Sequence, residues 1–177
     1  MVMPDARHRD RRNAVLGSVV FLALAPGVVA GVVPGLITGW EVGERLPGAL
    51  RALGFALVLV SAGVLLHAFG RFAIEGLGTP APVAPTRRLV VGGVYRFVRN
   101  PMYLAVVGAV AGQALVFGSL ELVVYGAVVA CAFVAFVRLY EEPTLRAEYG
   151  AEYDAYRAAV PGWIPRLTPS NVPEHPV

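Results

Sequence analysis

Four long apolar runs dominate this chain and restrict what it can fold into. They cover residues 14–37, 52–70, 100–120 and 122–137, and none of them contains Asp, Glu, Lys or Arg. A helix needs about 20 such residues to cross a bilayer. The last run is shorter than that, so we expect Arg138 to extend it by reaching toward the membrane interface. The pattern predicts four transmembrane helices.

Composition supports the same fold class. The chain of 177 residues is 56% hydrophobic and 15% charged, with a mean hydropathy of +0.63, which is too apolar for an ordinary soluble domain. We therefore predict an all-α integral membrane bundle of about four transmembrane helices, followed by a C-terminal cytoplasmic amphipathic helix. The net charge of +3 does not indicate a nucleic-acid partner. The single cysteine, Cys131, excludes a disulfide framework and is predicted to be a small packing residue.

The arginines predict the orientation of the spans. Most of them precede the first span, lie between the second and third spans, or follow the fourth, and the turn at 118–121 has none. The positive-inside rule then places both termini and the central loop in the cytoplasm, and we expect a bacterial inner-membrane protein. The first run could instead be a secretory signal, because Val28-Val29-Ala30 is an acceptable cleavage site. Its length and Pro26 favour an uncleaved span.

Two polar clusters lie at the ends of the last two runs. Arg99, Asn100 and Tyr103 begin the third span, and Glu141 and Glu142 follow the fourth. The short turn between these spans makes them antiparallel, so both clusters are expected at the same membrane face. A guanidinium binds a carboxylate through two hydrogen bonds, and a glutamate accepts hydrogen bonds from an ammonium or a hydroxyl group. The clusters predict a site for a zwitterionic ligand. A salt bridge that only closes the hairpin is the alternative.

The segments beside these clusters allow two interpretations each. The loop at 75–86, rich in proline and glycine, is either a linker or a lid. Gly92-Gly93 is either a simple turn or a close approach of the backbone to a ligand. Pro143 either starts a new helix or kinks the old one.

An aromatic stripe follows the fourth span. Leu145, Tyr149, Tyr153 and Tyr156 recur at helical spacing, which is typical of packing or of an interfacial anchor and also of a pocket lining. The three histidines are scattered, so we predict no metal site. Two polar residues inside spans, Ser61 and Gln113, are expected to form hydrogen bonds between helices.

These motifs resemble a known superfamily. Gly93-Val-Tyr-Arg-Phe-Val-Arg-Asn-Pro-Met-Tyr103 is followed, after the hairpin, by Glu141-Glu142-Pro143-x-Leu145-x-x-x-Tyr149-Gly150-x-x-Tyr153-x-x-Tyr156. Over roughly residues 76–166 this order is similar to the integral-membrane methyltransferases, which include isoprenylcysteine carboxyl methyltransferases and phospholipid N-methyltransferases. The Asn-Pro-Met-Tyr and Tyr-Glu-Glu-Pro stretches look more like the phospholipid branch, and the C-terminal tyrosines look more like the isoprenylcysteine branch.

The resemblance implies a cofactor and roles for these residues. S-adenosylmethionine would bind in a cytoplasm-facing pocket, which the acceptor enters laterally from the bilayer. The implied cofactor-binding residues are Gly93, Tyr95, Arg99, Asn100, Tyr103, Glu141 and Glu142. Arg99 and Glu142 are the expected catalytic pair, orienting an anionic group and handling a proton, and Tyr149, Tyr153 and Tyr156 are the expected substrate-binding residues. Many relatives have histidine at the position of Asn100, which puts general-base catalysis there in doubt.

The resulting hypothesis is a methyltransferase that moves a methyl group from S-adenosylmethionine to a lipidic or small apolar acceptor. The acceptor is either an isoprenylcysteine-like carboxylate or a phospholipid-like amine. Two alternatives remain: a membrane NADPH-dependent reductase of the steroid and sterol type, and a non-catalytic module with a degenerate site. The predicted division is residues 1–75 for the tail and first two spans, 76–166 for the methyltransferase core, and 167–177 for an irregular tail. The sequence does not indicate an oligomeric state.

Overall fold

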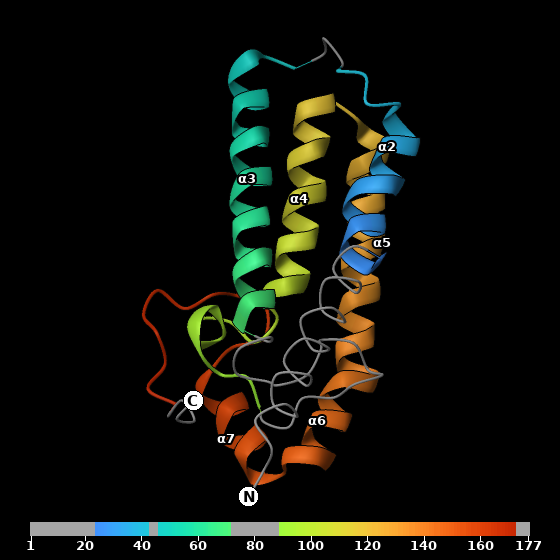
Figure 1. Ribbon diagram of the computed structural model, residues 1–177. Coiled ribbons are helices and arrows are strands. Elements are labelled where there is room, and N and C mark those ends of the chain that lie inside the picture. Colours follow the sequence, from blue (N-terminus) through green and yellow to red (C-terminus); the bar gives the residue numbers. More distant parts are fainter. Residues whose placement is uncertain (1–23, 43–45, 72–88, 173–177) are drawn as a thin grey trace, which may run out of the picture.

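The computed structural model describes residues 24–42, 46–71 and 89–172 (Figure 1). Within these ranges every regular element is helical, which confirms the predicted all-α membrane bundle. Several predictions lie outside the described residues: the basic N-terminal segment, the first part of the first span, and the loop at 75–86. The role of the loop at 75–86 as a linker or a lid, and the retention of the first span, therefore stay predictions.

Four apolar helical segments form the bundle. Residues 24–38 contain the π-helical segment η1 (Val28–Val32) and α2 (Val33–Thr38). They are followed by α3 (Gly48–Arg71) and α4 (Pro101–Phe117). The last is a continuous helix composed of α5 (Leu120–Phe136), the π-helical segment η4 (Val137–Glu141) and α6 (Glu142–Tyr149). In Figure 1, α3, α4 and α5 run along the bundle, with α2 over α5.

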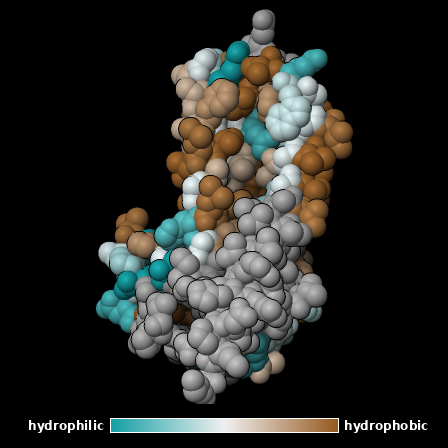
Figure 2. Space-filling model, viewed as in Figure 1, coloured by the Kyte–Doolittle hydropathy of each residue, from teal (hydrophilic) through white to brown (hydrophobic). Residues whose placement is uncertain are grey.

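Two of these helices are long and apolar enough to cross a membrane, namely α3 and the continuous helix Leu120–Tyr149. The other two are apolar but shorter. Only 22% of the most apolar window of each long helix is buried, whereas the core helix of a soluble protein is mostly buried. Figure 2 shows hydrophobic residues along the upper part of the bundle, with hydrophilic residues at its top edge and again at the lower left. The surface is therefore that of a helix bundle in lipid.

Small residues let α3 and α4 approach closely. A Cβ atom built on Gly54 would lie 2.6 Å from the carbonyl oxygen of Gly112, and one built on Gly108 would lie 2.6 Å from Oγ of Ser61. Glycines on facing helices permit such backbone contact, which is a common basis of helix association in membranes. Ser61 is buried at this crossing. The Gly-x-x-x-Gly spacing of α4 thus fixes where α3 crosses it.

A proline follows each π-helical segment. Pro34 lies in the first turn of α2, and Pro143 lies in the first turn of α6. Proline has no N–H group and its ring collides with the carbonyl four residues before it, so a wider helical turn relieves the clash. Side chains of neighbouring helices bind two carbonyl groups before Pro34. Gln113 Nε2 donates to the oxygen of Ala30 at 2.7 Å, and the Tyr125 hydroxyl donates to that of Val29 at 2.9 Å. The hydrogen bond predicted for Gln113 is therefore confirmed.

The structure corrects three details of the sequence analysis. The fourth span does not end at residue 137, because its helix continues through Pro143 to Tyr149. The turn between α4 and α5 is shorter than the predicted turn at 118–121, because α5 already begins at Leu120. It consists of Gly118, which has a φ of 63°, and Ser119, whose Oγ accepts a hydrogen bond from the Leu122 amide at 3.2 Å. Cys131 is exposed rather than packed, because it lies on an outward face of α5.

Two short elements complete the described chain at the base of the bundle. The 3-10 helix η3 (Gly93–Arg96) leads into α4, and α7 (Ala151–Ala159) follows α6 after Gly150. Buried side chains from both elements, from the residues next to them and from the end of α3 form a core: Ala68, Leu89, Val90, Val91, Tyr95, Tyr153, Tyr156 and Val160. This core supports the end of the hairpin at which the polar clusters lie.

Candidate functional site

Arg99 is the centre of a hydrogen-bond network just before α4. Its Nη1 donates to Oε1 of Glu142 at 2.8 Å and to the hydroxyl oxygen of Tyr153 at 2.9 Å. Its Nε donates to the carbonyl oxygen of Val160 at 3.0 Å. The side chains of Arg99 and Glu142 are only 12% and 16% exposed, so this ion pair is shielded from water, unlike an ordinary surface pair. Arg157 adds a second cation, with Nη2 3.5 Å from Oε2 of Glu142.

Tyr103 makes the second connection across the hairpin. Its hydroxyl donates to Oε2 of Glu141 at 2.6 Å. The ring of Tyr103 packs against that of Phe133, with 4.8 Å between centroids, and faces that of Trp163 at 6.3 Å. Adjacent residues on a helix point about 100° apart. Glu141 therefore reaches Tyr103 while Glu142 reaches Arg99, and the two sequence clusters meet at one end of the hairpin, as expected.

Asn100 precedes α4 and is 7% exposed. Among the described residues its Nδ2 has no hydrogen-bond partner, although almost no solvent reaches it. A buried amide group left without a partner costs about 1–3 kcal/mol, so such a group in a native fold needs an explanation. A Cβ atom built on Gly162 would lie 3.5 Å from Nδ2.

The tyrosine stripe belongs to the core beneath this network. Tyr153 and Tyr156 are 2% and 3% exposed, and Tyr149 packs against the same core. The Tyr156 hydroxyl donates to the carbonyl oxygen of Tyr95 at 2.8 Å. Burial raises the pKa of Tyr153 and the pKa of Tyr156. It also raises the pKa of Tyr95, with smaller contributions from Tyr156, Glu141 and Tyr103. These phenols therefore stay neutral at ordinary pH.

The tyrosines of the stripe therefore have different surroundings. The structure brings Tyr153 into the Arg99 network and places Tyr149 and Tyr156 in packing positions. Their assignment as substrate-binding residues stays a prediction.

Gly93 lies apart from the Arg99 network. It has a φ of 58°, and a Cβ atom there would lie 2.6 Å from Nε2 of His67 and 3.1 Å from Cδ of Arg71. Both the left-handed backbone and the close contact with α3 require glycine. Packing of η3 on α3 accounts for this residue, and its predicted role in shaping a cofactor pocket stays a prediction.

The sequence analysis assigned no role to the segment at 160–170, here called the C-terminal strap. Its backbone is hydrogen-bonded to the residues before α4: the Arg99 amide donates to Pro161, the Arg166 amide to Phe97 and the Ser170 amide to Arg96, each at 2.9 Å. Arg96 Nε also donates to the carbonyl oxygen of Ser170 at 2.8 Å. The strap is irregular, and the available signal was a tryptophan directly after Pro161-Gly162.

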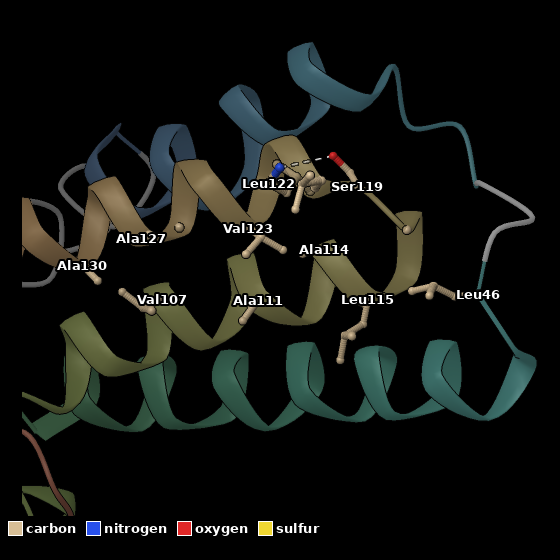
Figure 3. A pocket seen from close by; sticks show the side chains of 13 residues that line it. Leu46, Val107, Ala111, Ala114, Leu115, Ser119, Leu122, Val123, Ala127 and Ala130 are labelled. Carbon is tan, nitrogen blue, oxygen red and sulfur yellow. Dashed lines mark hydrogen bonds between the residues drawn. The ribbon is translucent and has the colours of Figure 1, made fainter.

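An apolar groove of about 590 Å³ runs between α4 and α5 toward the turn (Figure 3). Its walls are small and aliphatic side chains, among them Val107, Ala111, Leu122, Val123 and Ala130. Val107 lies one helical turn beyond Tyr103, and from there the groove extends away from the polar network to the turn between α4 and α5. Figure 3 shows its side chains coming from both helices.

The sequence model of the phospholipid methyltransferase family matches residues 49–152, which is more than half of the chain. The chain belongs to the phospholipid methyltransferase family. The match begins in α3, includes Arg99, Tyr103 and both glutamates, and ends in α7 just before Tyr153. A search of curated proteins gave no match.

Membership of the phospholipid methyltransferase family supports a membrane methyltransferase and does not favour the reductase alternative. The match extends further toward the N-terminus than the resemblance noted from the motifs, because it takes in most of α3. It stops before the C-terminal strap. The family match therefore covers the hairpin with both polar clusters and does not extend to the strap.

Proposed function

We propose that this phospholipid methyltransferase family member transfers the methyl group of S-adenosylmethionine to a lipidic acceptor, at the Arg99–Glu142 network. The observation that supports this most is the convergence of Arg99, Tyr103, Glu141 and Glu142 at the base of the α4–α5 hairpin. These residues come from two separate motifs. Shielding such a polar network at the end of a lipid-facing bundle costs free energy, so networks of this kind usually serve a function.

The residues present fit the chemistry of this cofactor. Its carboxylate needs cationic and amide donors, which Arg99 and Asn100 supply, and the Nδ2 atom of Asn100 is buried with no partner among the described residues. Its amino and ribose hydroxyl groups need acceptors, which Glu141 and Glu142 supply. When bound, the cofactor would contribute an activated methyl group on a sulfonium.

The groove between α4 and α5 supports an acceptor with an apolar chain. It is lined by hydrophobic side chains and begins one helical turn from Tyr103. A chain lying there would place a polar head beside the network without leaving the membrane. A phospholipid-like amine and an isoprenylcysteine-like carboxylate both satisfy this requirement.

The protein would act mainly by alignment and by excluding water. Bringing two reactants together in the right geometry supplies much of the rate enhancement of such transfers. Arg99 would hold an anionic group in place through its fixed set of donors. An amine acceptor must also lose a proton, and Glu142 is the acidic group for that step. Asn100 cannot act as a base and would serve as a hydrogen-bond donor.

We further propose that this site faces the cytoplasm of a bacterial inner membrane. The distribution of arginines along the sequence supports this orientation. A cytoplasmic location also gives the site access to a water-soluble methyl donor.

The test is a methyl-transfer assay on the purified full-length protein in vesicles of bacterial lipid extract, with S-adenosylmethionine labelled in its methyl group. We expect label in a lipid that mass spectrometry can identify. Glu142→Ala should abolish labelling, whereas Glu148→Ala, at an exposed position of α6, should not. NADPH replaces the labelled donor in a parallel absorbance assay. Oxidation of NADPH without labelling of any lipid would overturn the proposal. Absence of both lipid labelling and S-adenosylmethionine binding would also overturn it.

A further inference from the structure

The C-terminal strap is joined to the residues on which the proposed site depends. Its three backbone hydrogen bonds pair residues 161, 166 and 170 with residues 99, 97 and 96, so the two segments run antiparallel. Val160, where the strap begins, is 1% exposed and accepts a hydrogen bond from the Arg99 side chain. The strap is thus fixed against the start of α4, although it lies beyond the part of the chain that the family match covers.

Gly162 is the residue of the strap that faces the donors of Arg99 and Asn100. A Cβ atom there would lie 3.1 Å from Nη2 of Arg99 and 3.5 Å from Nδ2 of Asn100. The other guanidinium nitrogens, Nε and Nη1, donate to Val160, Glu142 and Tyr153. With no side chain at 162, no Cβ atom lies against Nη2 and Nδ2.

Trp163 brings an aromatic ring to the same place. It is partly buried, and its centroid lies 6.3 Å from that of Tyr103 with the planes tilted by 38°. This spacing is within the range of interacting aromatic pairs. Because the Tyr103 hydroxyl donates to Glu141, Trp163 lies beside the Tyr103–Glu141 pair.

We propose that the strap is one wall of the cofactor site. Gly162 leaves Arg99 Nη2 and Asn100 Nδ2 without a side chain against them, so that both can donate to the carboxylate of an amino-acid-bearing methyl donor, and Trp163 covers the site next to Tyr103. Two convergent donors, one of them charged, match the two oxygens of a carboxylate. Binding would also give the buried amide of Asn100 an acceptor. This inference rests on the proposed function, because it assigns residues to the same cofactor.

Calorimetry with S-adenosylhomocysteine as the probe tests the role of Gly162. The Gly162→Ala variant of the full-length protein in detergent should bind at least about tenfold more weakly than wild type, which corresponds to about 1.4 kcal/mol. The matched control is Gly63→Ala, since a Cβ atom on Gly63 meets nothing within 4 Å. It should bind like wild type. Thermal unfolding midpoints of both variants separate lost binding from lost folding.

Tryptophan fluorescence gives a second readout without altering Gly162. The chain has two tryptophans, and Trp40 lies at the far end of the bundle against Phe117. In Trp40→Phe, the emission of Trp163 should change as S-adenosylhomocysteine is added. In Trp163→Phe, the emission of Trp40 should not change.

The two proposals fail in different ways. Absence of S-adenosylhomocysteine binding to wild type would overturn the proposed function and the inference that rests on it. Normal binding by wild type together with an unchanged Kd in a folded Gly162→Ala variant would overturn the strap as a wall of the site. Unchanged Trp163 emission in a Trp40→Phe variant that still binds S-adenosylhomocysteine would also overturn the strap as a wall of the site.

Discussion

The hydroxyl group of Tyr103 lies 2.6 Å from Oε2 of Glu141, so the first turn of α4 is joined directly to the π-helical segment that precedes Pro143. The wider turn of η4 changes the direction in which the following side chains point, because each residue of a π-helix rotates less than in an α-helix. Glu141 accepts from Tyr103 on α4, and Glu142 accepts from Arg99 just before α4. A π-helical turn at the point where two polar clusters meet agrees with the frequent occurrence of such turns at functional sites.

Tyr103→Phe tests this connection. Loss of the hydroxyl removes the hydrogen bond to Glu141 but keeps the ring between Phe133 and Trp163. We expect a hydrogen bond to a charged group to contribute about 1.5–3 kcal/mol, so methyl transfer should fall by at least about tenfold. Activity in lipid vesicles and the unfolding midpoint are the measurements. Tyr140→Phe, at an exposed position, is the control, and equal activities of both variants would contradict the role of Tyr103.

Arg99→Lys keeps the charge and tests the geometry. The guanidinium reaches Glu142, Tyr153 and Val160 at once, and a lysine ammonium cannot place its donors in the same fixed directions. We expect methyl transfer to fall by about tenfold or more. Arg138→Lys, on an exposed position of η4, should retain activity. A fully active Arg99→Lys variant would show that charge alone is needed.

Tyr156→Phe should destabilise the fold. Its hydroxyl is buried and bonded to the carbonyl oxygen of Tyr95, which would be left without this donor, at a cost of about 1–3 kcal/mol. Unfolding by denaturant in detergent measures the change. A variant as stable as wild type would show that this bond contributes nothing.

Stability should also fall in alkaline solution. Burial raises the pKa of Tyr95, Tyr153 and Tyr156 above the value of about 10 that an unfolded tyrosine has. Below pH about 10 the phenols are neutral in both states, and their contribution to stability is fully present. Above it the unfolded chain releases protons first, so the free energy of unfolding decreases as the pH rises toward the folded-state values. A flat unfolding midpoint between pH about 9 and about 11 would contradict this.

Gly112→Leu should prevent α3 and α4 from packing. A Cβ atom on Gly112 would lie 2.7 Å from the carbonyl oxygen of Gly54 and 2.8 Å from Cγ2 of Val58, so a leucine side chain has no room there. We expect loss of the folded state in detergent, seen by size-exclusion chromatography and protease sensitivity. Gly63→Leu places the same side chain on an open face of α3 and should fold. Equal behaviour of both variants would rule out the glycine crossing as a determinant of the bundle.

Local sequence was sufficient to locate the apolar helices and to predict the pairing of the last two. Uncharged runs indicate spans because a bilayer requires apolar side chains and internally bonded backbone, and the short turn at Gly118-Ser119 leaves α4 and α5 only an antiparallel arrangement. The same pairing brought Arg99 and Tyr103 to the end of the hairpin where Glu141 and Glu142 lie. The continuation of the last helix through Pro143 was not predicted, because a proline allows either a break or a π-helical turn, and packing chooses between them.

Only the tertiary structure decided which groups complete the network. The strap has no helical or strand periodicity in its sequence. The carbonyl oxygen of Val160 accepts a hydrogen bond from Arg99, which lies 61 residues earlier in the chain. The aromatic stripe looked uniform in sequence, but the fold sends the Tyr153 hydroxyl to Arg99 and the Tyr156 hydroxyl to Tyr95. Spacing along a helix specifies a face. What that face meets depends on long-range packing, which the local pattern does not encode.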